Sequence, residues 1–94
     1  FTTNLRESKK FIQAGIGVST QYDDAVLGNV EAHQLALRSE ILGTMSNFSE
    51  EAIQGKSGRD DLANAIKDSL NKKLEELEGF GGVEYVHFTS FMLQ

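Results

Sequence analysis

The 94-residue sequence contains no cysteine and no proline. A chain without cysteine has no disulfide, no thiolate metal ligand and no thiol nucleophile, so three kinds of site are excluded together. No apolar run approaches the roughly 18 or more residues of a transmembrane helix, and no signal peptide opens the chain. Because Phe1 stands where an initiator methionine would be, we expect a processed or truncated product whose targeting or anchoring segment lay upstream.

The charge balance is mildly acidic. Nine Lys and Arg residues oppose fourteen Asp and Glu residues, which gives a formal net charge of −5. An acidic domain repels phosphate backbones, and no basic run is present that would dock onto anionic lipid, so nucleic acid and lipid headgroups are not expected partners. The hydrophobic content of 39% is ordinary for a soluble globular domain, and the length fits one domain over residues 1–94.

Few titratable side chains are placed to act together. His33 and His87 are the only histidines, and aspartate pairs at 23–24 and 60–61 stand at expected helix starts, where carboxylates favour the helix dipole. Neither pair has the spacing of a calcium loop. The glycine-rich residues 79–82 follow a helix and precede a strand, the reverse of a phosphate-binding loop. The sequence therefore predicts no catalytic residue, no metal and no cofactor.

Three segments have the pattern of β-strands. The first, residues 1–6, is short, and a turn at Glu7-Ser8 would join it to the second in a hairpin. Residues 83–93 carry apolar side chains on both parities, so this strand is either the centre of a covered sheet or a surface that meets another molecule. The clearest strand, residues 10–22, has one apolar parity, formed by Ile12, Ala14, Ile16, Val18 and Tyr22.

Two segments have the period of amphipathic helices. The first spans residues 26–46, and its apolar stripe comprises Val30, Leu37, Ile41 and Met45, widened by Leu35 and Leu42. A short turn at residues 50–53, capped by Ser49, leads to the second helix, for which Ser57 and Asp60 fit a capping box. Gly79, Gly81 and Gly82 end the second helix, and its stripe comprises Leu62, Ile66, Leu70, Leu74 and Leu77.

The predicted order is therefore strand, strand, helix, helical turn, helix, strand. Amphipathic helices need an apolar sheet face to cover. We expect an α+β fold, a two-layer domain in which the N-terminal hairpin and the C-terminal strand form an antiparallel sheet packed by two main helices.

Eight residues are candidates for contacts with another molecule. Gly15 and Gly17 indicate either a bulged strand or a bare patch where a helix or a second copy packs closely. Phe48 and Phe80, each in a predicted connection, are either tucked under their loops or exposed for a partner. One face of the first helix carries small residues that reflect either helix propensity or close packing against another helix or subunit, namely Ala32, Ala36, Ser39 and Gly43.

Several local patterns resemble, in order along the chain, the periplasmic part of the flagellar basal-body family FliL. The most specific is the terminal Phe88-Thr89-x-Phe91-x-x-Gln94. A proline common in the family before the first long helix is absent here, and Leu27-Gly28-Asn29 stands in its place. The remaining matches are the opening Phe1-Thr2-Thr3-Asn4-Leu5, then Lys10-Phe11-Ile12-Gln13, Ile16, Val18, Met45-Ser46, Ser49-Glu50, Gly58, Leu62, Asn71, Leu74 and Val86.

This resemblance implies an N-terminal membrane anchor missing from the sequence and a domain on the periplasmic side of the bacterial inner membrane, at the flagellar basal body. It implies association with the ion-driven stator of the motor, in support of torque under load. It also implies a fold like the stomatin and prohibitin (SPFH) domains, which assemble into membrane-bound rings. The family offers no catalytic residue to carry over.

Three hypotheses for function follow. The favoured one is a non-enzymatic structural and interaction module that self-associates and contacts the flagellar stator complex. The alternative is a small periplasmic enzyme or ligand-binding domain that uses a pocket near His87 and Tyr85, which requires a carboxylate within hydrogen-bond reach of His87. The third is a domain that binds nothing specific and only spaces the anchor from the motor.

Overall fold

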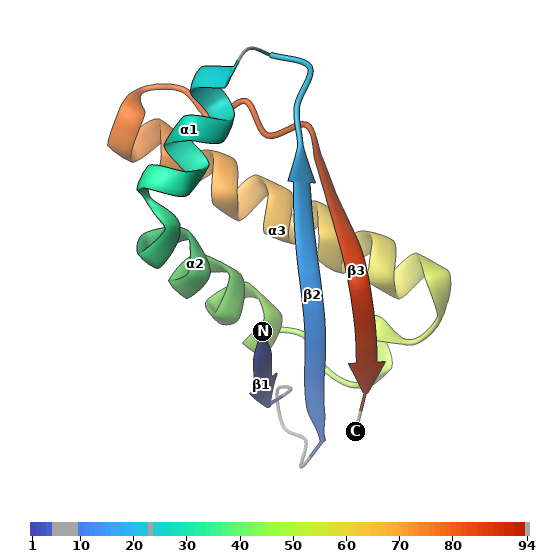
Figure 1. Cartoon of the computed structure of the whole chain (residues 1–94). Coiled ribbons are helices and arrows are strands. Elements are labelled where there is room, and N and C mark those ends of the chain that lie inside the picture. The colour runs from blue at the N-terminus through green and yellow to red at the C-terminus, as the bar shows by residue number, and fades with distance from the viewer. Residues whose placement is uncertain (5–9, 23, 94) are drawn as a thin grey trace.

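The computed structural model describes residues 1–4, 10–22 and 24–93 of the chain. The predicted turn at Glu7-Ser8 lies outside these residues, as do Leu5, Asp23 and Gln94. The secondary structure elements, shown in Figure 1, are β1 (Thr2–Asn4), β2 (Phe11–Ser19), α1 (Asp24–Ala32), α2 (Gln34–Ser46), the 3-10 helix η1 (Glu51–Ile53), α3 (Gly55–Glu78) and β3 (Tyr85–Leu93).

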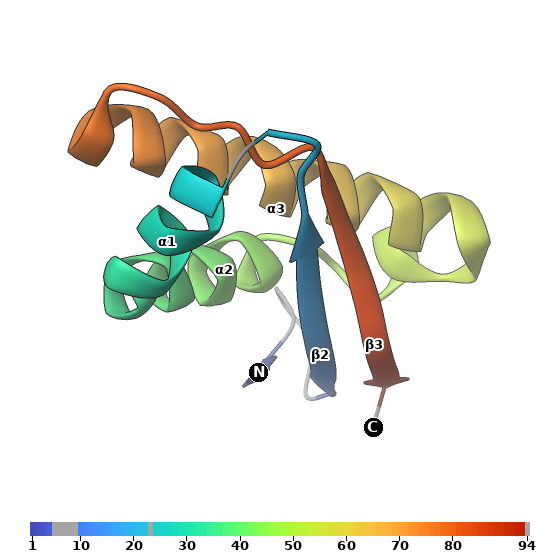
Figure 2. The ribbon, with the colours of Figure 1, turned by 45° about the horizontal axis from the view of Figure 1, so that its top comes forward.

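The three strands form one antiparallel sheet in the order β1-β2-β3. Thr2 pairs with Gln13, and Ile12 pairs on its other side with Leu93. Figure 2 shows α1, α2 and α3 on the same face of the sheet. They pack there because that face presents the apolar side chains of β2 and β3 that join the core. The predicted two-layer α+β architecture is confirmed, with three helices in place of the two that were expected.

The predicted helix over residues 26–46 is two helices. The chain breaks at His33, whose backbone angles are φ −107° and ψ 25°, and α2 begins at the next residue. The break lets α1 turn relative to α2 (Figure 1). Val26 of α1 lies against Gly82 in the connection before β3 and is 2% exposed. A periodic apolar pattern does not reveal such a break, because the pattern continues in phase on both sides of it.

The start of α3 also differs from the prediction. Its N-cap is Gln54, no side chain caps it, and Ser57 lies inside the first turn, so the capping box at Ser57 and Asp60 is wrong. Gly55 has φ +75°, a conformation that glycine adopts readily, and this allows the helix to begin earlier. The predicted end is confirmed, since Gly79 is a left-handed C-cap with φ +79° whose N–H donates to the Glu75 carbonyl.

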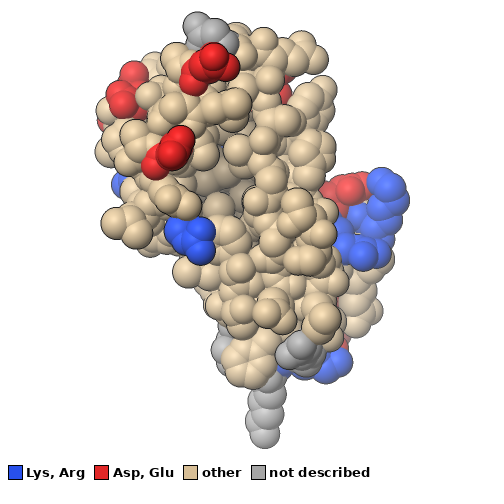
Figure 3. All heavy atoms as spheres, in the orientation of Figure 1, with Lys and Arg blue, Asp and Glu red and all other residues tan. Residues whose placement is uncertain are grey.

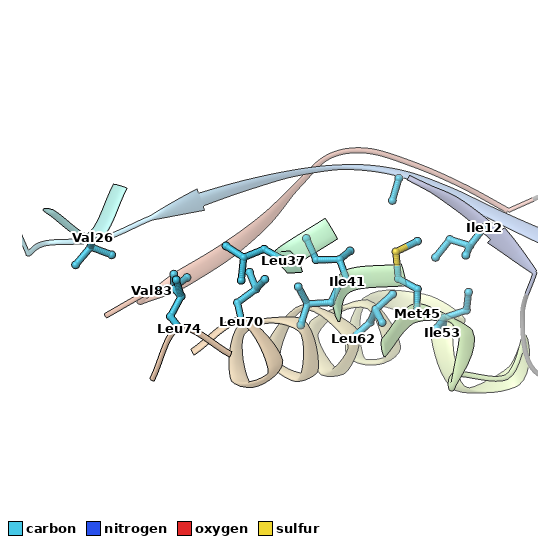
Figure 4. Packing of buried hydrophobic residues seen from close by; sticks show 12 residues of the cluster. Ile12, Val26, Leu37, Ile41, Met45, Ile53, Leu62, Leu70, Leu74 and Val83 are labelled. Carbon is cyan, nitrogen blue, oxygen red and sulfur yellow. The ribbon is translucent and has the colours of Figure 1, made fainter. Parts of the chain in front are cut away.

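The core lies between the sheet and the helices (Figure 4), and the predicted stripes supply most of it. Leu35 is 86% exposed and Leu77 is 42% exposed, so both lie outside the core that was predicted to contain them. Tyr22, 56% exposed, follows the end of β2 and is also outside it. The fully buried large side chains are Ile12, Met45, Ile53, Leu62, Ile66, Leu70, Leu74 and Val26.

Candidate interaction surfaces

A β-bulge explains why β3 is apolar on both parities. Ser90 faces Gly15 and Phe88 faces Ile16, so Thr89 is an extra residue opposite β2. The bulge shifts the parity by one, and both halves of the strand therefore turn apolar side chains toward the helices. The four that pack against the buried core are Val86 and Phe88 before the bulge, and Phe91 and Leu93 after it.

β3 forms an edge of the sheet, which decides against the alternative of a central covered strand. Natural edge strands are commonly protected by lysine, proline or a bulge. Over its nine residues, β3 contains no Asp, Glu, Lys, Arg or Pro, and the bulge at Thr89 is the one such feature that its described residues show. Its outer edge is therefore suited to pairing with a further strand.

The face of the sheet turned away from the helices is uncharged. Neither β2 nor β3 contains an Asp, Glu, Lys or Arg residue, and Figure 3 shows this face without spheres of these residues over the two strands. Phe11, Tyr85 and Met92 are about half exposed. In a domain with a net charge of −5, an uncharged face with exposed apolar side chains is a candidate contact surface.

The two candidate glycines differ in their surroundings. A Cβ on Gly15 would meet Thr89 Oγ1 and would lie 2.9 Å from Ser90 Oγ, so side chains of β3 already occupy the space over Gly15. The Gly15 N–H donates to Ser90 Oγ at 3.0 Å. A Cβ on Gly17 would make only an ordinary contact, 3.7 Å from Thr89 Cγ2. The bulge accounts for Gly15, whereas the space over Gly17 admits a side chain.

The small residues predicted on the first helix fall on both sides of the break at His33. Ala32, Ser39 and Gly43 are exposed and Ala36 is half-buried. A Cβ added to Gly43 would have no atom within 4 Å, so nothing in the described part of the chain packs closely on that position. Leu35 lies four residues before Ser39 in α2, on the same side of the helix, and is 86% exposed, so it adds a large apolar side chain to this surface.

Phe48 and Phe80 occupy different environments. Phe48 is half-buried and packs against the core, as the interpretation of a tucked loop expects. Phe80 is 48% exposed and makes an edge-to-face contact with Tyr22 at a centroid distance of 5.1 Å. Because Tyr22 is exposed as well, the two rings form an aromatic pair at the surface.

The histidines are placed for structural contacts. His87 is exposed, stacks on Tyr85 at 6.0 Å and lies 3.3 Å from Ser19 Oγ through Nε2. Its recorded hydrogen-bond partner is therefore a hydroxyl and not the carboxylate that the enzyme hypothesis requires. His33 Nε2 lies 3.0 Å from Glu78 Oε1, a contact that joins the helix break to the last turn of α3.

No metal-binding arrangement is found within residues 1–4, 10–22 and 24–93. Among them, no three His, Asp or Glu side chains lie close enough together to hold a metal ion. None of the described helices is both long enough and apolar enough to cross a membrane.

One feature that the sequence did not reveal is an apolar groove between β2 and the first two helices. It has a volume of about 150 Å³, and Figure 3 shows a hollow on this face of the molecule. Its apolar walls include Ile16 and Val18 of β2, Val30 of α1, and Leu37 and Ile41 of α2. Phe1 closes one end, with the Arg38 guanidinium 4.8 Å from its ring centroid. The groove arises because β1 covers only the first part of β2, which periodicity cannot indicate.

Comparison with known proteins gives a match over the whole sequence. Residues 1–94 match the family described as flagellar basal body-associated protein FliL. The chain is 29% identical over 93 residues to the flagellar protein FliL of Bacillus subtilis (strain 168), covering 99% of this chain and 62% of the relative. It is 27% identical over 95 residues to the flagellar protein FliL of Aquifex aeolicus (strain VF5), covering 100% and 56% respectively.

The chain thus spans roughly three fifths of the length of these two relatives. The family is non-enzymatic, which agrees with the absence of a predicted catalytic group and leaves the enzyme hypothesis at His87 without support. The resemblance seen in the residue patterns is confirmed over its full extent. The chain belongs to the FliL family of flagellar basal body-associated proteins.

Proposed function

We propose that this domain is a structural module of the flagellar motor that associates with further copies of itself and supports the ion-driven stator units when the motor works under load. The observation that carries the proposal is the match of the whole chain to a flagellar basal-body family. The uncharged outer face of the sheet and the edge of β3, which carries no Asp, Glu, Lys, Arg or Pro, support it, because both are features of surfaces that bind other proteins.

Self-association into a ring needs two different surfaces on each copy, since an interface of one surface with itself closes at a dimer. The domain offers two such surfaces. One is the sheet, with its uncharged face and the β3 edge, and the other is the exposed small-residue surface of α1 and α2 that contains Ser39 and Gly43. Ring assembly of this kind, with the SPFH-like fold that the resemblance implies, is part of the proposal.

The proposal places the domain on the periplasmic side of the inner membrane, held there by an N-terminal membrane anchor. The greater length of the two relatives is consistent with additional segments. An anchor would confine the copies to a plane and raise their effective concentration, so that weak contacts between domains suffice for assembly. A monomeric isolated domain in dilute solution is the expected consequence of such weak contacts.

The first test is the swimming speed of a strain that lacks the gene, in thin and in viscous medium, with complementation by the full-length protein. We expect a loss of speed that grows with viscosity and is reversed by the gene. Unchanged swimming at every viscosity, with flagella intact, would refute the proposed role in the motor.

Surface variants then separate an interaction module from a spacer. Ser39→Arg places a long charged side chain on the exposed small-residue surface, and we expect it to reduce swimming in viscous medium. Asn64→Arg, at an exposed position of α3, is the matched control and should swim as the parent does. Equal swimming of both variants would favour a domain that only spaces the anchor from the motor.

A further inference from the structure

Strand β1 is much shorter than the strand on which it pairs. β1 spans three residues and β2 spans nine, and the pairing runs from Asn4 opposite Phe11 to Thr2 opposite Gln13. Phe1 extends it by one position, because its nitrogen donates to the Ala14 carbonyl at 2.8 Å and its carbonyl accepts from the Ala14 N–H at 2.8 Å. Beyond Ala14, no described strand pairs with this edge of β2.

The unpaired part of this edge is in position to accept a strand. Backbone groups two residues apart along a strand point to the same side. Ala14 directs its N–H and carbonyl toward β1, so Ile16 and Val18 direct theirs toward the same side of β2. The Gly15 N–H and the Ser19 carbonyl, at odd positions, are bonded on the β3 side, as this alternation requires.

The nitrogen of Phe1 fixes where a preceding residue would go. This nitrogen already donates to the Ala14 carbonyl as the amide of a paired strand would. A chain that continues from it in extended form therefore runs along β2 toward Ser19. In an antiparallel register, the second residue before Phe1 faces Ile16 and the fourth faces Val18. Five further residues reach Ser19 and cover about 17 Å of the edge.

The apolar groove lies beside this same edge. Ile16 and Val18 form one of its walls, and the inward face of β1, on which Phe1 packs against the core, leads directly into it. Inward side chains of an added strand would enter the groove, whose volume of about 150 Å³ matches that of apolar cavities able to accept a molecule as large as benzene. Backbone pairing and apolar burial would thus be satisfied by one segment.

We propose that the residues immediately preceding Phe1 in the full-length protein continue β1 along β2 as far as Ser19 and fill this groove. The inference rests on the proposed function for the existence of a membrane anchor upstream. It adds that the anchor joins the domain through a strand of the sheet and not through a flexible linker. The orientation of the domain relative to the membrane is therefore restricted.

The test is an engineered disulfide in the full-length protein in membranes. The third residue before Phe1 would face Gly17 in a non-hydrogen-bonded pair, with Cα atoms about 4.5 Å apart, within the range that a disulfide spans. Gly17→Cys is tolerated, because a Cβ there makes only an ordinary contact of 3.7 Å. Residues 1–94 contain no cysteine, so they contribute no competing thiol.

We expect the protein with Gly17→Cys and a cysteine at the third residue before Phe1 to shift, on oxidation, to a faster-migrating monomer band in a non-reducing gel. A cysteine moved to the second residue before Phe1 would lie on the other face of the strand and should give little of this band. If the protein with the first cysteine pair fails to accumulate, Ser19→Cys with a cysteine at the fifth residue before Phe1 repeats the test.

The outcome identifies the occupant of the groove. Failure of both matched pairs to form the intramolecular bond, in protein that accumulates normally, would overturn the proposal. A disulfide-linked dimer in place of the shifted monomer would also overturn it and would assign the edge to a second copy. The crosslink does not depend on motor function. If the matched crosslink forms but loss of the gene leaves swimming unchanged, the proposed function is refuted and the strand proposal is not.

Discussion

The side chain of Asn71 forms hydrogen bonds with both backbone groups of Val83. Its Nδ2 donates to the Val83 carbonyl and its Oδ1 accepts from the Val83 N–H, each at 2.8 Å. Val83 is 4% exposed and stands just before β3, where no neighbouring strand pairs with it in the described sheet. Buried backbone groups require partners, and the amide of Asn71 takes the place of a strand. This contact connects α3 to the start of β3.

Asn71→Ala should lower the free energy of unfolding by about 2–3 kcal/mol, because both backbone groups of a buried residue lose their partners. Asn64→Ala on the same helix is the control, since Asn64 is exposed, and its effect should stay within about 0.5 kcal/mol. Chemical denaturation of the two variants measures both values. Equal stabilities would contradict the role assigned to Asn71.

Gly58→Ala should destabilise the domain by about 1–3 kcal/mol through overpacking. Gly58 is buried in the first turn of α3, and a Cβ there would meet the Ala52 carbonyl oxygen and lie 2.9 Å from the Ile53 carbonyl carbon. These are backbone atoms of η1, which cannot rotate away as a side chain can.

Gly43→Ala is the matched substitution for Gly58→Ala. Gly43 lies inside α2 with no atom within 4 Å of an added Cβ, so alanine should raise the free energy of unfolding by about 0.5–1 kcal/mol. Thermal unfolding of both variants under one set of conditions gives the comparison. A shift of the same sign for the two would show that packing at Gly58 does not decide the outcome.

Deletion of Thr89 should leave the fold intact. Without this residue, Phe88 stays opposite Ile16 and Ser90 opposite Gly15, and β3 becomes a regular strand with the same apolar side chains turned inward. Deletion of His87 instead shifts Val86 and Tyr85 to the wrong faces, with an expected loss of about 1.5–3 kcal/mol for the side chain removed from the core. Denaturant titration of the two deletion variants decides whether Thr89 is the extra residue, since comparable losses would place the irregularity elsewhere.

Phe48→Ala and Phe80→Ala should differ in stability. Phe48 packs against the core, and its truncation should lower the free energy of unfolding by about 2 kcal/mol or more. Phe80 is half-exposed and contacts Tyr22 at the surface, so its truncation should lower it by about 1 kcal/mol or less. Urea unfolding followed by circular dichroism measures both, and a larger loss for Phe80 would show that this aromatic pair supports the fold itself.

The candidate contact surface was predicted from the sequence only in part. Ser39, Gly43 and Phe80 are exposed, and their contact with another molecule stays a prediction. Gly15 is instead explained by Thr89 and Ser90, which lie some 75 residues away along the chain. Such a neighbour is invisible to any local pattern, because the helices separate the two strands along the chain.

Local sequence patterns alone identify the type of each element and most of the core. The helical period placed Leu62, Ile66, Leu70 and Leu74 on one buried stripe, and Gly79 ended α3 because a left-handed residue favours glycine. These features depend on residues within a turn or two of one another.

Four features are visible only in the folded domain: the break at His33, the bulge at Thr89, the edge position of β3 and the groove beside Phe1. Each of these depends on which distant segment packs against or pairs with another. The apolar pattern of β3 is compatible with a central strand or an edge strand. Only an edge strand has one side whose backbone groups can form hydrogen bonds with another chain. The physical reason is that burial is a property of pairs of elements, whereas periodicity is a property of one element alone.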